Sequence, residues 1–162
     1  MHSTTQKIMT HLCYMDQAEE AVNFYLSIFE NSRIINISHF GKDEFAPAGT
    51  MRTITFELLG QRFWAVNGGP NCKFSNGVSI YVNCDTQEEI DYYWEKLSEG
   101  GEKQPCGLLT DKYGLSWHIA PSIMEDLLND ATPEKSGRAT NAFLKMQKLD
   151  IETIRQAYEG NL

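Results

Sequence analysis

The sequence predicts an α+β fold in which two βαβββ modules form a cupped mixed sheet and a helical C-terminal extension follows. Two observations predict this fold. A strand pattern, a helical pattern and three further strand patterns succeed one another, and the same order then occurs a second time. After the second unit the apolar residues recur at helical spacing alone, which indicates a tail without strands.

The first module is predicted at residues 7–70. Its helix opens at Asp16, and the turn Asn67-Gly68-Gly69-Pro70 ends its last strand. The apolar residues of the helix recur at helical spacing and are Ala18, Ala21, Val22, Tyr25, Leu26, Ile28 and Phe29. The strands are expected at residues 7–14, 33–40, 50–58 and 61–66.

The second module is predicted at residues 77–121. Its helix begins at Asp85 or Thr86, both good N-terminal caps, and ends before the pair Gly100-Gly101. The strands are expected at residues 78–84, 102–104, 108–110 and 115–120.

The tail is predicted at residues 122–160. Thr132-Pro133-Glu134 is a strong helix start, because proline is favoured at the first helical position. Two shorter helices are expected at 123–128 and 150–158. The apolar stripe of the tail comprises Ala139, Phe143, Met146 and Leu149. We expect these helices to cover an open sheet edge or a partner subunit.

Composition narrows the class of function. The 162 residues suffice for one domain with a sizeable core, and the net charge of -8 argues against nucleic acid and anionic membranes as partners. The N-terminal sequence MHSTTQKIMT has no signal-peptide pattern, and no apolar run is long enough to span a membrane. We therefore expect a cytoplasmic protein with a small-molecule ligand or a protein partner.

The four cysteines form no CxxC pair, which argues against a zinc ribbon or a redox dithiol. In a reducing compartment we expect free, buried thiols. Cys106 is the one considered as a nucleophile, but the sequence shows neither a nearby base nor a group that would lower its pKa, so a structural thiol is the favoured interpretation.

Strand alternation divides the candidate residues between two faces. One face mixes aromatics with hydroxyls, one arginine and one histidine, which is typical of a small-molecule pocket. Its predicted members are Thr10, Tyr14, Arg62, Trp64, Ser79, Tyr81, Ser116 and His118. The opposite face is predicted to lie in the hydrophobic core. It comprises His11, Cys13, Phe63, Ala65, Ile80, Val82, Trp117 and Ile119.

Several ordered motifs resemble the PhnB-like branch of the glyoxalase/bleomycin-resistance/dioxygenase superfamily, also called the vicinal oxygen chelate proteins. They extend over nearly the whole chain and are AEEAVNFYLSIF, NGGP, DTQEEID, CGLLTDKYGLSW and KMQKLDIETIRQAYEG. The resemblance implies a cupped sheet and a homodimer, in which modules can be exchanged between chains.

The resemblance also implies where a metal would bind. In enzymes of the superfamily, His, Gln or Glu from the first and last strands of each unit hold a divalent cation. The matching positions here are Thr10, Trp64, Ser79 and His118. Only His118 is a good ligand, and strand parity directs the neighbouring His11 to the opposite face. We therefore expect no cofactor, with His118 and His11 as the candidate ligands if a divalent metal is bound.

The predicted function is to bind a small organic molecule in the cup, with chemical transformation of that molecule as a further hypothesis. His118 would act as a polar anchor or a general acid/base, with Tyr14, Tyr81 or Arg62 as its partner; a purely structural histidine is the competing interpretation. The alternatives are a metal-dependent lyase or dioxygenase, and a protein that sequesters its ligand without catalysis. A methyltransferase activity is not expected, because no glycine-rich turn for S-adenosylmethionine is apparent.

Overall fold

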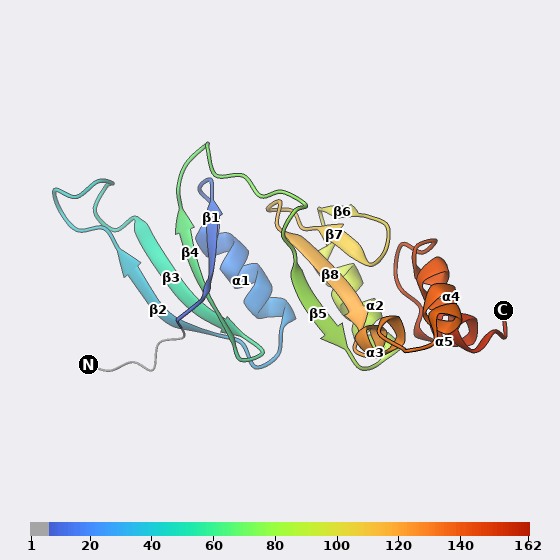
Figure 1. The fold of residues 1–162 in the computed structure, drawn as a ribbon. Coiled ribbons are helices and arrows are strands. Elements are labelled where there is room, and N and C mark those ends of the chain that lie inside the picture. Colours follow the sequence, from blue (N-terminus) through green and yellow to red (C-terminus); the bar gives the residue numbers. More distant parts are fainter. Residues whose placement is uncertain (1–6) are drawn as a thin grey trace. The chain divides into compact units, whose positions relative to one another are not determined.

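The computed structural model describes residues 7–162, so most of the N-terminal sequence considered above lies outside the described part. The chain divides into two compact units, Met1–Lys73 and Phe74–Leu162. Each unit has its own four-stranded sheet (Figure 1).

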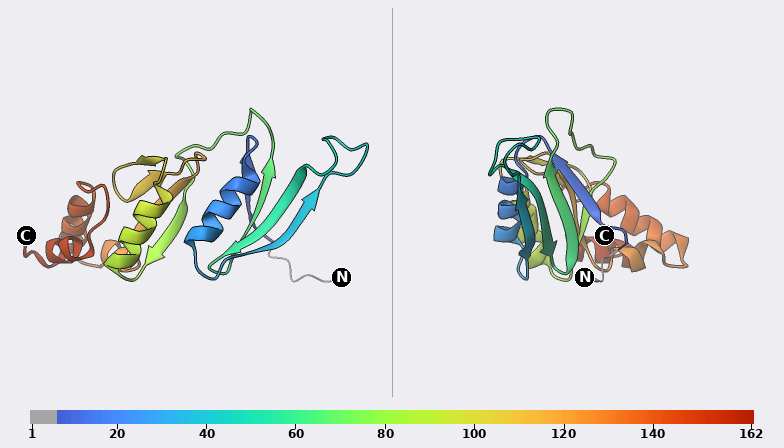
Figure 2. Two further views of the ribbon diagram at one scale, coloured as in Figure 1. Left: turned by 180° about the vertical axis from the view of Figure 1, so that it is seen from behind. Right: turned by 90° about the vertical axis from the view of Figure 1, so that its left-hand side faces the viewer.

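The first unit is a βαβββ module. Its elements are β1 (Thr10–Tyr14), α1 (Ala18–Ile28), β2 (Arg33–His39), β3 (Met51–Leu58) and β4 (Gln61–Asn67). The strands lie in the order β1-β4-β3-β2, with β1 parallel to β4 and the other pairs antiparallel. Helix α1 covers one face of this sheet, as both views of Figure 2 show. The other face has no helix of the unit against it.

The core of the first unit lies between α1 and the sheet. Leu12 of β1 pairs in register with Ala65 of β4, and both are buried. Tyr14 is also buried, and its hydroxyl lies 3.1 Å from that of Tyr25 in α1. The core is therefore built from alternate strand residues and the predicted apolar stripe of the helix.

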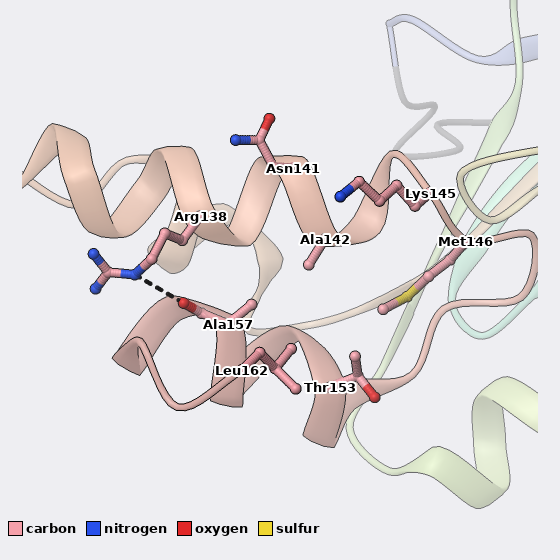
Figure 3. A pocket seen from close by; sticks show the side chains of 8 residues that line it. All are labelled: Arg138, Asn141, Ala142, Lys145, Met146, Thr153, Ala157 and Leu162. Atoms are coloured by element: carbon pink, nitrogen blue, oxygen red, sulfur yellow. Dashed lines mark hydrogen bonds between the residues drawn. The ribbon is translucent and has the colours of Figure 1, made fainter.

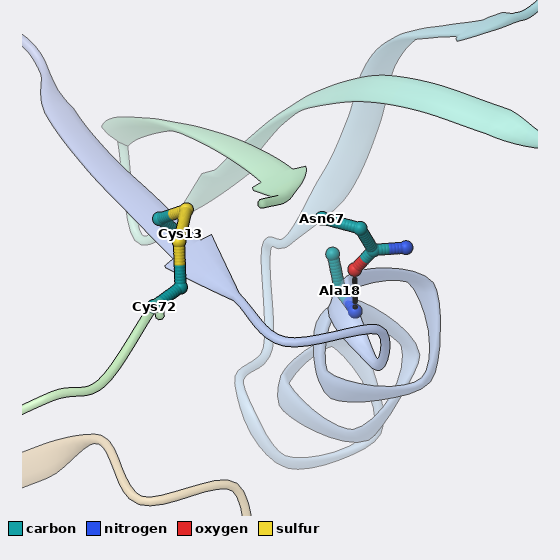
Figure 4. Close-up of a disulfide and its surroundings, with 4 residues drawn as sticks. All are labelled: Cys13, Ala18, Asn67 and Cys72. Atoms are coloured by element: carbon teal, nitrogen blue, oxygen red, sulfur yellow. Dashed lines mark hydrogen bonds between the residues drawn. A yellow bond between two sulfur atoms is a disulfide. The ribbon is translucent and has the colours of Figure 1, made fainter. Parts of the chain in front are cut away.

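Asn67 links the end of β4 to the start of α1. Gln17, the residue before the helix, makes no side-chain cap, and the Oδ1 atom of Asn67 accepts a 2.9 Å hydrogen bond from the backbone N–H of Ala18 instead (Figure 4). The first helical amides have no partner within the helix, so this contact satisfies one of them. The turn after β4 thus has a structural role.

The second unit repeats the order. Its module comprises β5 (Ile80–Cys84), α2 (Gln87–Leu97), β6 (Glu102–Lys103), β7 (Leu108–Thr110) and β8 (Ser116–Pro121). The strand order is β5-β8-β7-β6, again with the first and last strands parallel. Thr86 is the N-cap of α2, and its side chain accepts from the amide of Glu89. Figure 2 shows α2 against one face of the sheet, where Trp94 and Trp117 are buried.

Three helices complete the second unit: α3 (Met124–Leu128), α4 (Pro133–Phe143) and α5 (Ile151–Glu159). Their buried side chains form a small core with the end of β8, made of Ala120, Met124, Ala139, Leu149 and Ile154. The side chain of Gln87 in α2 donates to the carbonyl of Leu149 and accepts from the amide of Ile151. The tail is therefore docked on its own unit by both packing and hydrogen bonds.

The predicted fold class is confirmed: the chain is α+β, with two βαβββ modules and a helical extension. Each unit contains a four-stranded mixed sheet. Within residues 7–162, no helix is long and apolar enough to cross a membrane.

The prediction of free thiols is wrong for two of the cysteines. Cys13 and Cys72 form a disulfide, with their Cα atoms 5.7 Å apart (Figure 4). The parallel pairing of β1 with β4 brings the residues after β4 beside the end of β1, which the linear sequence does not reveal. A Cβ atom at Gly68 would collide with both sulfur atoms, so the bridge requires glycine there. Cys84 is free and buried, as predicted, and Cys106 is free and partly buried.

Candidate functional site

The face of the second sheet opposite α2, hereafter its uncovered face, brings together the residues best suited to chemistry. At the end of this face Ala120 packs against the tail helices. Tyr81 of β5 and His118 of β8 are register partners, so their side chains lie on the same face. Their rings meet edge to face with centroids 4.8 Å apart. His118 is partly buried, whereas Tyr81 is 47% exposed. This pair presents an imidazole and a phenol to one small region of surface.

The surroundings of the pair favour the neutral form of both groups. Burial lowers the pKa of His118 from its ordinary value of 6.5, and a hydrogen bond to the backbone of Cys106 only partly opposes this. Burial also raises the pKa of Tyr81, with smaller contributions from Cys84 and Glu125. At neutral pH the face therefore offers an uncharged imidazole and a protonated phenol.

A line of hydrogen-bonded polar side chains borders this pair. Ser116 donates to Asn76 over 3.1 Å, the amide of Asn76 lies 3.5 Å from Gln104, and Gln104 donates to Thr110 over 2.9 Å. Ser116 is almost fully buried, and Thr110 is its register partner in β7. These contacts hold the polar groups in defined orientations.

Three of these hydrogen-bonded residues were not predicted from the sequence as part of the site: Asn76, Gln104 and Thr110. Thr110 could have been found, because the hairpin from β7 to β8 places it opposite Ser116 on the same face. Asn76 and Gln104 lie outside the strands, where alternation gives no information about direction. Their roles become visible only in three dimensions.

The turn before β8 places His118. The carboxylate of Asp111 is buried and accepts from the amides of Tyr113 and Leu115, at 2.9 and 3.1 Å. It also accepts from the indole N–H of Trp117 on the core face. Because Trp117 is held on one side of β8, strand alternation directs His118 to the other. Asp111 is thus a structural support for the site.

The uncovered face of the first sheet carries a second histidine–aromatic pair. His11 of β1 and Trp64 of β4 are register partners, and their ring centroids are 5.2 Å apart. Trp64 is 39% exposed. Arg62 lies on the same face and forms an ion pair of 3.7 Å with Glu57, which also contacts Arg33. Arg62 is therefore already paired, as expected for a surface cation.

The predicted face of β1 is wrong. Thr10 and Tyr14 share the helix-covered side with Leu12, while His11 lies with Trp64 on the uncovered side. The reason is burial: Leu12 must face the core, and residues two apart in a strand point the same way. Tyr14 is consequently a core residue bonded to Tyr25, and it does not face the surface that holds Trp64.

The remaining candidates lie on the second unit. Ser79 directly precedes β5 and is partly buried. Tyr81, Ser116 and His118 share the predicted face, since β8 alternates as expected. The structure therefore gathers three of the eight predicted binding residues on the second sheet and two, Arg62 and Trp64, on the first.

Thr10, Trp64, Ser79 and His118 are the ligand positions expected from the sequence, but strand pairing does not place Thr10 opposite Trp64 or Ser79 opposite His118. The register partners are His11 with Trp64 in the first unit and Tyr81 with His118 in the second. Each pair contains one histidine. No group of three or more His, Cys, Asp or Glu side chains suited to a metal occurs among residues 7–162.

Comparison with known proteins identifies the family. The model of a family described as 3-demethylubiquinone-9 3-methyltransferase matches residues 6–120. A structure from Bacillus cereus, described as a PhnB protein with a proposed activity of that name, is 38% identical, with a TM-score of 0.66. The match covers 72% of this chain and 99% of that one.

Two more distant structures share the fold. Protein PA1353 from Pseudomonas aeruginosa is 21% identical, with a TM-score of 0.60 over 72% of this chain and 98% of that one. The fosfomycin resistance protein FosX from Listeria monocytogenes, solved with Mn(II) and sulfate, is 18% identical, with a TM-score of 0.52 over 72% and 92%. No curated protein matches the chain.

The family match extends over more than half of the sequence and ends at the close of β8, while the Bacillus cereus relative is covered almost completely. The chain therefore belongs to the family described as 3-demethylubiquinone-9 3-methyltransferase, the PhnB-like branch of the glyoxalase/bleomycin-resistance/dioxygenase superfamily.

Proposed function

We propose that the protein binds a small organic molecule on the uncovered sheet face that carries His118. The observation that supports this most directly is the pairing of His118 with Tyr81, next to an ordered line of hydroxyl and amide groups. Binding sites for small molecules combine apolar and aromatic surface with a few fixed polar groups. The face of the second sheet has that composition.

The protonation states suggest what His118 does. With its pKa lowered by burial, the imidazole is neutral at pH 7 and can accept a proton or a hydrogen bond from the ligand. Tyr81 keeps its proton and can donate to a ligand oxygen. The pair would therefore suit a ligand with a hydroxyl or acidic C–H beside a carbonyl or similar oxygen, and His118 would serve as anchor or general base.

We propose that the protein works without a complete metal site. Of the four ligand positions expected from the sequence, Thr10, Trp64, Ser79 and His118, only His118 is a good ligand for a divalent cation. Trp64 carries no atom that binds a hard divalent cation.

One observation supports the metal-dependent alternative. His11, expected to face the core, lies on the same face of its sheet as Trp64, so each unit presents one histidine beside an aromatic register partner. We therefore keep a metal-dependent lyase or dioxygenase as the second candidate, with His11 and His118 as its ligands.

Metal analysis separates these two candidates. Protein purified without chelator should contain only substoichiometric Mn, Fe, Ni or Zn, unchanged by His118→Ala. Stoichiometric metal that is lost in both His118→Ala and His11→Ala would refute the metal-free proposal and support the alternative. His39→Ala is the control, because His39 is an exposed residue of β2.

A ligand screen tests binding itself. Small acids, aldehydes and aromatic antibiotics are added to the full chain, and thermal shift and Trp fluorescence are recorded. A true ligand should bind about fivefold more weakly to His118→Asn, the effect of losing one hydrogen bond of about 1 kcal/mol. His39→Asn should bind normally. If no compound binds, or if both variants behave alike, the proposal fails.

Catalysis is then distinguished from sequestration. Each ligand found is incubated with the protein and followed by NMR. Conversion that His118→Asn abolishes would identify an enzyme with His118 as an acid/base group. Stable recovery of the unchanged ligand would identify a sequestration protein.

A further inference from the structure

A cavity lies between α4 and α5, and the residues that line it all belong to the tail after β8 (Figure 3). Its volume is about 380 Å³. Ligand sites for small molecules occupy roughly 300–1,000 Å³, so the cavity has the size of a binding site. The proposed function makes no use of it.

The wall of the cavity is partly apolar. Ala142 of α4 points toward α5 in Figure 3, and Leu162 lies across the space from it. Ala157 and Met146 extend the apolar lining. Because alanine fills so little of the gap between the two helices, room remains for an apolar group of a ligand.

The same cavity is positively charged. Arg138 of α4 and Lys145, which lies two residues after the end of that helix, both line it. No Asp or Glu belongs to the lining, although the chain as a whole carries a net charge of -8. Within residues 7–162, neither cation forms a salt bridge. Their charge is therefore available to a ligand.

Arg138 is held in place before any ligand arrives. Its Nε atom donates to the carbonyl of Ala157 over 2.9 Å, and one terminal nitrogen donates to the carbonyl of Tyr158 over 2.7 Å. These bonds fix the guanidinium at the C-terminal end of α5. A fixed cation loses little side-chain entropy on binding, so it is a favourable anchor for an anion.

We propose that this cavity binds a small organic anion with an apolar body, such as a medium-chain or aromatic carboxylate. Arg138 and Lys145 neutralise the anionic group, and the apolar body lies against Ala142, Ala157 and Met146. The lining of this cavity shares no residue with the face that carries His118. The proposal for the cavity can therefore be refuted without refuting the function proposed for His118.

Octanoate is the probe for this site. It is titrated into the full chain and followed by calorimetry and by methyl NMR of labelled alanine and methionine. Octanoate should bind and shift the methyl signals of Ala142, Ala157 and Met146. Acetate, which lacks the apolar body, and 1-octanol, which lacks the charge, should each bind at least about fivefold more weakly.

Two variants locate the binding. Lys145→Gln should weaken octanoate binding about fivefold, the effect of one partly exposed ion pair. Ala142→Leu should abolish binding, because leucine is a good helix former that fills the cavity. Lys135→Gln is the control: it removes one lysine charge from the neighbouring helix α4, but Lys135 does not line the cavity.

Three outcomes would overturn the proposal. The first is equal binding of octanoate and 1-octanol. The second is normal octanoate binding by Ala142→Leu when its thermal unfolding is unchanged. The third is a shift of the three methyl signals with protein concentration and not with octanoate, which would identify a second copy of the chain as the occupant. His118→Asn should leave octanoate binding at this site unchanged.

Discussion

The rings of His11 and Trp64 lie side by side across the β1–β4 ladder, with their centroids 5.2 Å apart. The two residues are register partners, so the contact follows directly from the pairing of the strands. The contact shows that His11 faces away from α1, and it leaves the indole of Trp64 accessible on the uncovered face.

Trp64 should account for the quenchable fluorescence of the protein. Of the three tryptophans it is 39% exposed, while Trp94 and Trp117 are 2% and 1% exposed. Acrylamide should therefore quench one component of the emission, and Trp64→Phe should remove that component. Quenching that persists in Trp64→Phe would show that a core tryptophan is accessible.

The stability of the protein should fall as the pH drops below 6.5. The pKa of His118 is lowered in the folded state, so the unfolded chain binds a proton first. The stability due to neutral His118 is complete above the unfolded value of 6.5 and is lost as the pH falls through the folded pKa. Urea unfolding between pH 7.5 and 4.5 should show a smaller loss for His118→Gln than for the parent, with His39→Gln behaving like the parent.

Asp111→Ala should destabilise the protein by about 3 kcal/mol, because three donors, two of them in buried hydrogen bonds, lose their acceptor. Asp111→Asn should have an intermediate effect, since it keeps one oxygen for the two amides but turns an N–H₂ group toward the indole of Trp117. Urea unfolding measures both. Asp126→Ala, an exposed change in α3, should cost less than about 0.5 kcal/mol, and a similar loss in both alanine variants would contradict the role given to Asp111.

The disulfide can be tested by counting the free thiols before and after reduction. Iodoacetamide in denaturant without reductant should label only Cys84 and Cys106, and prior reduction should add Cys13 and Cys72. In the folded protein Cys84 should resist labelling, because burial raises its pKa to about 12.

Gly68→Ala should prevent the same disulfide, because the added Cβ would occupy the space of both sulfurs. Gly69→Ala is the control. Unlike Gly68, Gly69 has a positive φ, 82°, so Gly69→Ala adds backbone strain, but its Cβ meets no neighbour within 4 Å. Labelling of all four cysteines without reductant is expected for Gly68→Ala alone. A bridge that forms equally in both variants would refute the steric argument.

The superfamily resemblance leads us to predict a homodimer. Light scattering coupled to gel filtration should give twice the chain mass of 18.4 kDa. A monomer at micromolar concentration would refute this prediction.

Much of the fold was predictable because its signals are local. Alternation located the strands, and turn glycines such as Gly60 and Gly114, both at positive φ, separated them. The cap at Thr86 and the proline at the start of α4 marked helix starts that the structure reproduces. Each of these signals depends on residues that are close in the sequence.

The candidate site was predicted only in part, because the direction of a strand face depends on what covers it. The alternation of β1 was assigned correctly, but its two sides were exchanged, even though Leu12 has the same parity as Thr10 and Tyr14 and should have marked the core side. Asn76, Gln104 and the Cys13–Cys72 bridge join residues far apart in the chain. No local pattern predicts such contacts.

Cys106 connects the tail to His118. Its amide donates to the carbonyl of Met146, the next amide donates to Gln147, and its own backbone is hydrogen-bonded to the His118 ring. The segment between α4 and α5 therefore holds the backbone that is hydrogen-bonded to His118. A protein shortened before Met146 would keep both βαβββ modules and lose these two hydrogen bonds, so the backbone beside His118 would be held less firmly.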